Sequence, residues 1–370
     1  MSPILSAYIV FLRWCLAEGS IEDILPTAKG ICWHDLLEFA KKQSLVGVFY
    51  GGILRLGQMT TNKPTDDDVM EWMAVANKIR KRNEQMFERA AFVHRTFLSE
   101  GFRNCLLKGQ GNALMYPDPM MRTPGDIDIW VEGGDRKAIK YVRRISPDAK
   151  ICYHHIDFKK VKGVEVEVHY RPSFMNNLRA NRRLQAFFNE HAGHQFNNEV
   201  KGPNGVDAFS VPTWDFNVVF QLCHIANHFF NEGVGLRQIV DYYYLLSQRQ
   251  GEDRRAELRQ LGLSRVAGAV MYVERHYLGL AQEHLVSDED RRRGEMLMKE
   301  IMAGGNFGQY DERLLSGVYN NKVLKNVQRL VRDVRLALLF PSESLWEPVF
   351  RWWHFFWRRK MNKLASTDAQ

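Results

Sequence analysis

Two aspartates that are two residues apart, Asp126 and Asp128, are the residues whose types and spacing most clearly predict chemistry. On a strand, successive side chains alternate between faces, so both carboxylates would point the same way while Ile127 and Ile129 point into the core. Mg²⁺ prefers such oxygen ligands and is bound by one or two carboxylates together with phosphate oxygens and water. The pair therefore predicts a metal site, while two alternating acids at a strand end are also common on a solvated sheet edge.

A third acid follows further along the chain. Residues 153–161 and 164–169 alternate as two strands joined at a Lys-Gly pair, which predicts a β-hairpin. In the second strand Glu165, Glu167 and His169 share the face opposite to the valines. A carboxylate from this strand could therefore complete a site with the two aspartates.

Before the aspartates, an apolar strand ends in a glycine turn. The apolar run 105–107 breaks at Gly109 and Gly111, ahead of a helix-like segment. Such a turn lets backbone N–H groups approach a phosphate. Lys108 could neutralise triphosphate charge or be a solvated strand end, whereas the guanidinium of Arg122 can bridge phosphate or hold the carboxylates in place.

With these motifs the chain resembles the nucleotidyltransferases of the DNA polymerase β superfamily, and in particular the bacterial group described as uncharacterised nucleotidyltransferases. The match covers roughly residues 30 to 290, judged by the order of motifs. The motifs that carry the resemblance are Lys108-Gly109, Arg122 before the segment 125–128, and the segments 33–37, 166–170 and 236–241, the last preceded by His224 and His228.

The resemblance implies an α+β fold, in which a polymerase β-like nucleotidyltransferase module with a small mixed sheet is flanked by N- and C-terminal helical regions. It also implies transfer of a nucleoside monophosphate from a nucleoside triphosphate to an acceptor, with Mg²⁺ or Mn²⁺ as cofactor and pyrophosphate as product. The residues that it assigns are Asp126, Asp128 and Glu167 to catalysis and metal binding, Lys108, Gly109, Gln110, Arg122 and Gly125 to the nucleotide, and His169, His224, His228, Arg237 and Asp241 to an acceptor pocket.

Two positions depart from the superfamily pattern. The Gly-Gly or Gly-Ser pair after the first strand is here Gly109-Gln110, and the third acid, commonly Asp, is Glu167. The first departure bears on the contacts to phosphate. The second leaves metal binding intact, because Glu also supplies carboxylate oxygens.

The residues of the expected acceptor pocket also have simpler explanations. His224 and His228 are four apart on a predicted helix, so they could share a metal, but no glutamate lies between them as a general base. Core packing or hydrogen bonding is the favoured role for both histidines, ahead of substrate contact. Arg237 and Asp241 are likewise four apart, and an intrahelical ion pair is their simplest explanation.

The length of 370 residues and the 45% hydrophobic content allow at least one full core and suggest several modules. No apolar run approaches the ~20 residues that span a bilayer, and the apolar stretch 4–12 lacks a preceding basic segment, so a cytoplasmic location is expected. The five cysteines form no Cys-x-x-Cys pair, which argues against a disulfide framework or a structural zinc site.

Hydrophobic periodicity predicts a helical start, an α/β middle and a helical end. The regions are 1–100, an N-terminal helical region; 101–175, the nucleotidyltransferase core; 176–321, a C-terminal helical region; and 322–370, basic aromatic-rich tail helices. Within them we expect helices in two pieces over 1–56, near 112, and at about 69–100, 136–145 and 176–191. We expect strands at 104–107 and 127–131 and a hairpin-like turn at 197–211. Thr213 is the expected cap of a further helix.

The net charge of +8 is concentrated near the C-terminus. Residues 322–363 contain ten basic and three acidic side chains, and four of the nine tryptophans lie in the same segment. Aromatic rings favour the membrane interface and basic residues favour anionic headgroups, so peripheral contact with an anionic membrane is one interpretation. A terminal helix packed on the protein, or an oligomer contact, is the slightly favoured alternative.

Two other functions remain open. A glycosyltransferase can also use Asp-x-Asp to hold a metal and a nucleotide sugar, but an α/β nucleotide-binding half should then precede the motif, and here about a hundred residues with helical pattern do. A non-catalytic nucleotide-binding or membrane-docked regulatory protein is the second alternative, against which the intact acids argue. The acceptor, which could be a sugar, a metabolite, a protein side chain or RNA, is not revealed.

Overall fold

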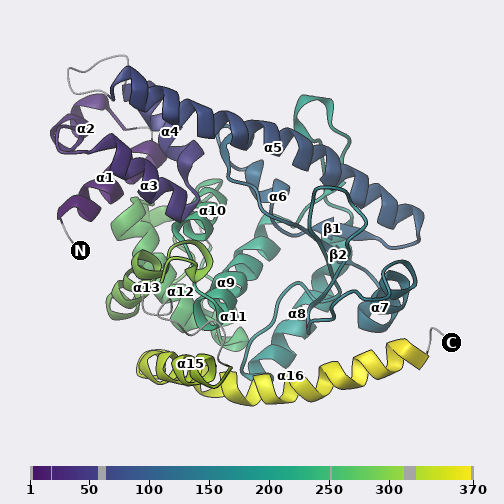
Figure 1. The fold of residues 1–370 in the computed structure, drawn as a ribbon. Coiled ribbons are helices and arrows are strands. Elements are labelled where there is room, and N and C mark those ends of the chain that lie inside the picture. The colour runs from purple at the N-terminus through teal and green to yellow at the C-terminus, as the bar shows by residue number, and fades with distance from the viewer. Residues whose placement is uncertain (1–2, 18, 57–63, 251, 312–321, 368–370) are drawn as a thin grey trace.

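Helices dominate the computed structural model, which places a small sheet among them (Figure 1). The structure describes residues 3–17, 19–56, 64–250, 252–311 and 322–367. Within these ranges, no helix combines the length and the apolar content that crossing a bilayer requires. Many helices together with one mixed sheet confirm the expected α+β class.

The N-terminal region folds into four helices, not into the two pieces predicted over residues 1–56. They are α1 (Pro3–Ala17), α2 (Ile21–Ala28), α3 (Trp33–Gln43) and α4 (Val46–Leu56). α3 ends at Ser44, whose positive φ of 56° places it in the left-handed conformation. Glycine or asparagine usually takes this position, so the serine gives no clear signal of a helix end in the sequence.

The long helix α5 (Asp66–Ser99) confirms the helix predicted at about 69–100. It begins earlier because Thr65 and Asp68 form a capping box, in which each side chain accepts a hydrogen bond from the other residue's backbone N–H. Gly101, with a φ of 77°, follows its end. α5 extends along one edge of the molecule, past the sheet (Figure 1).

Four short strands form the mixed sheet in the order β1-β2-β4-β3. Their bounds are Asn104–Leu106 for β1, Ile127–Val131 for β2, His155–Asp157 for β3 and Val166–His169 for β4. The outer pairs β1–β2 and β3–β4 are antiparallel, whereas the central pair β2–β4 is parallel. The two strands that carry the candidate acids are therefore direct neighbours.

The pairing of β3 with β4 confirms the predicted hairpin, with shorter strands than expected. His155 lies opposite His169, and the N–H of Phe158 still donates to the carbonyl of Val166 beyond the regular strands. Gly163, at a φ of 76°, lies in the turn between them. The predicted helices after β1 and β2 are also present, as α6 (Gln110–Ala113) and α7 (Gly134–Ile145).

The C-terminal helical region surrounds the other side of the sheet. Its helices are α8 (Leu178–Phe196), α9 (Trp214–Asn231), α10 (Leu236–Ser247), α11 (Arg255–Leu261), α12 (Ser264–Val273) and α13 (Arg291–Gly304). Between α8 and α9, the strands β5 (Glu199–Val200) and β6 (Phe209–Ser210) form the hairpin-like turn that the sequence predicts. Thr213 precedes α9 as expected, but its hydroxyl donates to Gln195 Oε1 and does not cap the helix.

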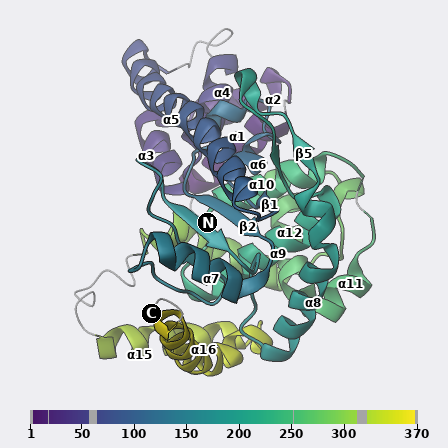
Figure 2. The same cartoon turned by 90° about the vertical axis from the view of Figure 1, so that its right-hand side faces the viewer.

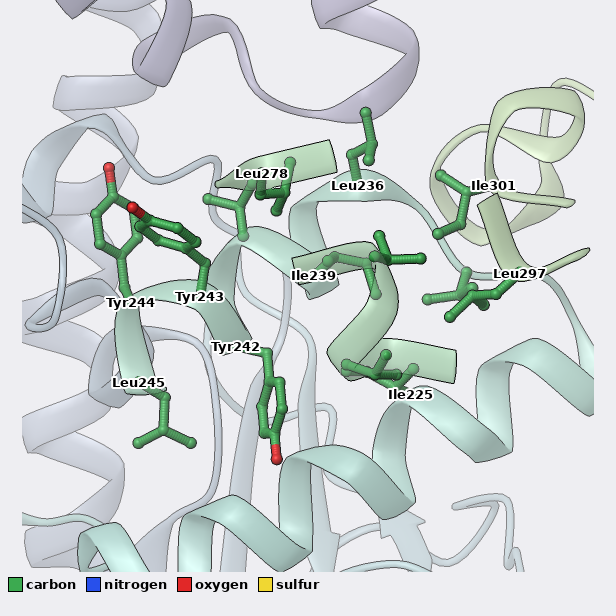
Figure 3. Packing of buried hydrophobic residues seen from close by; sticks show 14 of the residues in the cluster. Ile225, Leu236, Ile239, Tyr242, Tyr243, Tyr244, Leu245, Leu278, Leu297 and Ile301 are labelled. Atoms are coloured by element: carbon green, nitrogen blue, oxygen red, sulfur yellow. The ribbon is translucent and has the colours of Figure 1, made fainter. Parts of the chain in front are cut away.

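Helix α10 is buried on all sides. Every residue from Leu236 to Leu246 is buried, and Figure 3 shows Ile239 packed among apolar side chains from neighbouring helices, with Ile301 of α13 nearby. Two of these buried residues, Arg237 and Asp241, carry charges. An unpaired buried charge is very costly. The residues that pair with Arg237 and Asp241 therefore identify the part of the protein that α10 holds in place.

Two clusters of buried side chains form the cores, and α5 contributes to both. One joins α1–α4 to α8–α13 and includes Trp72 of α5. The other lies between the second half of α5, the sheet and α7, and includes Phe87 and Phe97. The N- and C-terminal helical regions thus share a core, and the predicted domain boundaries at 100, 175 and 321 stay predictions.

The tail forms α15 (Lys322–Ala337) and α16 (Pro341–Thr367), which lie along the edge of the molecule opposite α5 (Figures 1 and 2). One face of α16 packs on the protein. The rings of Phe350 and Trp357 each lie 5.5 Å from the ring of Tyr153, and Met361 joins the core of the sheet. The packed-helix alternative therefore applies to this face of α16.

The contact between α4 and the loop before β2 gives a first prediction. Gly47 and Gly51 lie about one turn apart on α4, but a Cβ at Gly47 would clash with the carbonyl oxygen of Met121, whereas one at Gly51 would meet nothing within 4 Å. We expect Gly47→Ala to lower the free energy of unfolding by about 1–3 kcal/mol through overpacking. Gly51→Ala should raise it by up to about 1 kcal/mol, because alanine favours a helix.

Urea unfolding followed by circular dichroism measures both variants. Equal effects of the two substitutions would contradict the tight contact between α4 and Met121.

Candidate active site

The sheet brings the three predicted acids to one place. In the parallel β2–β4 ladder Asp128 lies opposite Glu167, and Asp126 lies immediately before β2. Ile127 and Ile129, only 3% and 0% exposed, point into the core, as the strand alternation predicts. Asp126 and Asp128 both line a pocket on the other face.

Lys108 and His169 lie against Asp128. Lys108 Nζ and His169 Nε2 are each 2.9 Å from Asp128 Oδ1, and His169 Nε2 is 3.3 Å from Glu167 Oε2. Burial by itself would raise the pKa of Asp128, but Lys108 and His169 hold it well below its usual range. Lys108 is therefore not the solvated strand end of the simpler interpretation, since its side chain is only 17% exposed.

The charge of Asp128 raises the pKa of Asp126, and burial adds to the effect. Two carboxylates this close oppose each other's ionisation, and a bound cation removes that penalty. The electrostatics of the pair thus favour a cation beside it.

The donor atoms fit a divalent metal ion. Ligand atoms of Asp128, Glu167 and His169 all lie within 4.8 Å of one another. Asp128 Oδ2 is buried and has no hydrogen-bond partner among the described residues, although a buried carboxylate oxygen normally has one. A cation would satisfy this oxygen, and because His169 adds a nitrogen to the oxygen donors, Mn²⁺ fits as well as Mg²⁺.

Two further histidines lie near Glu167: His155 is on β3, and His154 directly precedes β3. His155 Nδ1 lies 3.2 Å from Glu167 Oε2 and 3.1 Å from His154 Nε2. Burial would lower the pKa of His155, but hydrogen bonding to Asp157 and the charge of Glu167 raise it to about 10. His154 is different, because burial and the neighbouring histidines lower its pKa well below the usual value. Sequence alternation places only one of this pair inward, whereas both rings contact His169.

Arg122 forms its ion pair away from Asp126, Asp128 and Glu167. Its Nε and Nη2 each lie 2.7 Å from one oxygen of Asp241 on α10, and both side chains are 5% exposed. The hydrogen bonds of Asp241 go to Arg122, Tyr116 and Asn112 and not to Arg237. The intrahelical Arg237–Asp241 pair is therefore wrong, because the side chain of Asp241 points across to the loop before β2.

The residues around this pair were not predicted from the sequence. Tyr116 OH lies 2.6 Å from Asp241 Oδ1, Asn112 Nδ2 lies 3.2 Å from Asp241 Oδ2, and Gln221 Nε2 of α9 donates to Asn112 Oδ1. Asn112 and Tyr116 are four apart after the glycine turn, and this spacing is the signal that could have identified them. Gln221 has a similar signal, because it lies one turn before His224.

The glycine turn is positioned by α5. Gly109 has a φ of 59°, and a Cβ there would lie 3.3 Å from the carbonyl oxygen of Asp126, so the turn approaches the acids closely. The side chain of Gln110 donates to Asn83 of α5, which in turn donates to the carbonyls of Met120 and Arg122. The side chain of Gln110 is therefore structural, and only its backbone faces the turn.

The pocket lies between the sheet and helices α9 and α10. Its walls include Lys108, Gly125, Asp126 and Asp128 on one side, and His224, Arg237, Asp241 and Phe307 on the other. Its free volume of about 30 Å³ holds a couple of water molecules and not a nucleotide.

The basic groups of this pocket differ in their state. Burial and the charge of Lys108 lower the pKa of His224 well below the usual value, so its ring is neutral at pH 7. Arg237 donates from Nη1 to the carbonyl of Thr123, and its buried Nε has no hydrogen-bond partner in the described part of the chain. His228 lies outside the lining, with Nδ1 3.1 Å from Glu232 Oε2. Gln110, Glu167 and His169 do not line the pocket either, but His169 links Glu167 to Asp128, whereas the other predicted site residues line it.

Comparison with family models gives the general class of the protein. Residues 29–279 match the family described as uncharacterised nucleotidyltransferase, and the chain belongs to this family. Comparisons with curated proteins and with solved structures found no match. The family confirms the resemblance inferred from the motifs, makes the protein a nucleotidyltransferase at this general level, and implies a nucleotide substrate.

The buried Arg122–Asp241 pair gives a second prediction. Asp241→Asn keeps the shape of the side chain but leaves the charge of Arg122 uncompensated, so we expect the free energy of unfolding to fall by about 3–5 kcal/mol. Arg103 and Glu132 form a pair with the same two-nitrogen geometry on the surface, so Arg103→Gln should change little. Chemical unfolding of both variants makes the comparison.

The pH dependence of the Asp241→Asn variant follows from the same pair. Burial would raise the pKa of Asp241, but Arg122 lowers it below its ordinary value. Ionised Asp241 therefore contributes its full stabilisation above about pH 4 and loses it as the pH falls through the lowered pKa. The difference in free energy of unfolding between wild type and Asp241→Asn should become smaller in acid. Equal free energies of unfolding for wild type and Asp241→Asn at pH 7 would contradict the role of the pair.

Proposed function

We propose that this protein is a metal-dependent nucleotidyltransferase whose sheet module is the polymerase β-like catalytic unit. It transfers a nucleoside monophosphate from a nucleoside triphosphate to an acceptor and releases pyrophosphate. The observation that carries this proposal is the adjacency of Asp128 on β2 and Glu167 on β4, with Asp126 immediately before β2 and with a buried carboxylate oxygen of Asp128 that lacks a partner among the described residues.

Asp126, Asp128 and Glu167 would hold Mg²⁺ or Mn²⁺, with His169 as a nitrogen donor or as the group that orients Asp128 and Glu167. The ion supplies charge neutralisation at the triphosphate and at the departing pyrophosphate. Lys108 Nζ lies 2.9 Å from Asp128 Oδ1. We propose that Lys108 exchanges this partner for phosphate oxygens when nucleotide binds, since its ammonium group is a mobile point charge.

The chemical step needs a proton acceptor as well as charge neutralisation. An oxygen of the acceptor forms a bond to the α-phosphorus, the bond from that phosphorus to pyrophosphate breaks, and the acceptor's proton passes to Glu167. Glu167 is 29% exposed at the side chain, so an acceptor hydroxyl can reach it. His155 on its other side stabilises the carboxylate form, because Glu167 Oε2 is 3.2 Å from His155 Nδ1.

The far wall of the pocket suits the rest of the nucleotide or the acceptor. Arg237 has an unpaired buried nitrogen in the described structure, which fits an anionic group, and neutral His224 can bond a hydroxyl. Arg122 is a positioning residue in this proposal, because both of its bonding nitrogens engage Asp241. Since the free volume is about 30 Å³, side chains such as Lys108 and Phe307 must move to admit a nucleotide.

The alternatives receive less support. Residues 3–99 are helical wherever an element is assigned, so the α/β half expected of a glycosyltransferase before its Asp-x-Asp motif has no counterpart there. A non-catalytic nucleotide-binding protein would not require Asp128, Glu167 and His169 in metal-binding geometry. The acceptor remains unassigned among sugar, metabolite, protein side chain and RNA.

A third prediction tests the metal site. Asp126→Asn and Asp128→Asn should each abolish nucleotide transfer while the protein stays folded, because the charge that holds the metal is lost. The assay incubates the purified protein with each labelled nucleoside triphosphate, Mg²⁺ or Mn²⁺ and cell extract, and follows the label and the released pyrophosphate. Wild-type protein should also melt at a higher temperature in Mn²⁺, and Asp128→Asn should lose that shift. Near wild-type pyrophosphate release from either variant would refute the site.

A fourth prediction compares the roles of Glu167, which is on β4, and Glu165, which directly precedes β4. Glu167 lies opposite Asp128, whereas Glu165 is exposed and only its backbone carbonyl is engaged, by the N–H of Ile127. Glu167→Gln should therefore lower the transfer rate by about 100-fold or more, which is typical for loss of a general base, and Glu165→Gln should leave it near wild type. The same pyrophosphate assay measures both, and a larger loss from Glu165→Gln would reverse the assignment.

A further inference from the structure

The described part of helix α15 leaves apolar side chains in solvent. Leu336 is buried, but Val331 and Val334 are 65% and 69% exposed, and Leu338, which directly follows the helix, is 81% exposed. Two arginines of α15 turn toward the protein instead: Arg332 donates to the carbonyls of Phe230 and Asn231, and Arg335 lies 2.8 Å from Glu300. In water an amphipathic helix normally buries its apolar stripe, so these exposed side chains favour contact with an apolar surface outside the protein.

Helix α16 continues the same surface. While its inner face packs on Tyr153, Leu345, Trp352 and Phe356 of the opposite face are 63%, 69% and 48% exposed. These residues are seven and four apart, which places them on one stripe of the helix. We define the outer face as Val331 and Val334 of α15 and Leu338 directly after it, together with Leu345, Trp352 and Phe356 of α16.

The charges on the outer face have one sign. Arg359 and Lys360 are exposed and follow the stripe at its C-terminal end. The acids among residues 330–364 are Asp333, Glu343 and Glu347, and each is only 5% exposed. The outer face therefore presents tryptophan, aliphatic groups and cations without an accessible carboxylate in this part of the chain.

We propose that the outer face docks the protein on the surface of a bilayer that contains anionic lipids. The two helices run along one edge of the molecule in both views (Figures 1 and 2), so they can lie together in the plane of an interface. Apolar side chains then enter the boundary between headgroups and acyl chains, and Arg359 and Lys360 bind the headgroup phosphates. A second copy of this chain is less suited as occupant, because its outer face offers no accessible negative charge to these cations.

This inference does not depend on nucleotidyl transfer, so binding and catalysis can fail separately. The full chain is mixed with sedimentable vesicles of phosphatidylcholine alone or with phosphatidylglycerol added. The protein should pellet with the anionic vesicles, and the binding should weaken as salt rises from about 0.05 to about 0.5 M, because the headgroup attraction is screened. A chain truncated before α16 is not used, because Phe350, Trp357 and Met361 pack in the protein.

Substitutions on the outer face test the fifth prediction. Trp352→Glu combined with Phe356→Glu should reduce vesicle binding by about tenfold or more, since two apolar contacts become anionic. The matched control is Phe92→Glu on α5, which is 47% exposed like Phe356 at 48% but lies on the helix at the opposite edge. Arg359→Gln with Lys360→Gln should weaken binding to anionic vesicles without changing the melting temperature.

Three outcomes would contradict docking of the outer face on a bilayer. Equal binding by wild type and the Trp352/Phe356 variant, or no binding of wild type to anionic vesicles, overturns the proposal. A dimer in analytical ultracentrifugation that the same variant dissociates, without vesicle binding by wild type, overturns it in favour of a second copy on the outer face. Circular dichroism confirms that each variant is folded.

Discussion

The buried ion pair between Arg122 and Asp241 is the constraint on which the site depends. Both groups are nearly inaccessible, so the cost of removing two charges from water is met only while the two-nitrogen contact stays intact. Arg122 lies in the loop before β2, and Asp241 lies on the fully buried helix α10. The pair therefore joins the sheet module to the helical region, and any shift between them would leave a charge unpaired.

The network around this pair positions the rest of the pocket. Asn112 and Tyr116 fasten the segment after the glycine turn to Asp241, and Asn83 of α5 holds the carbonyls on both sides of Met121. Polar networks of this kind are costly when half satisfied, which makes the arrangement stiff. A stiff frame suits charge placement, because catalysis of phosphoryl-type transfer consists largely of holding charges at fixed distances.

The surface of the molecule divides into two chemically different regions. The pocket combines carboxylates, histidines and basic groups between the sheet and α9–α10. Helices α15 and α16 instead carry exposed apolar and cationic side chains. α16 links the two, because its inner face packs on Tyr153, which directly precedes His154 and His155. The proposed docking surface and the proposed transfer site are thus connected through the packing of α16.

Local pattern by itself determined the order of helical and sheet regions, the long helix α5, the strand that carries Asp128 and the β3–β4 hairpin, while the choice of Glu167 as third acid came from the family resemblance. These features depend on alternation, capping and turn residues, which are encoded over a few neighbouring positions. Only the tertiary structure decided that β2 and β4 are parallel neighbours, that Asp241 pairs with Arg122, and that both His154 and His155 approach Glu167. Those contacts join residues far apart in the chain, and their partners are set by packing and by the requirement that buried charges be paired, which no local spacing records.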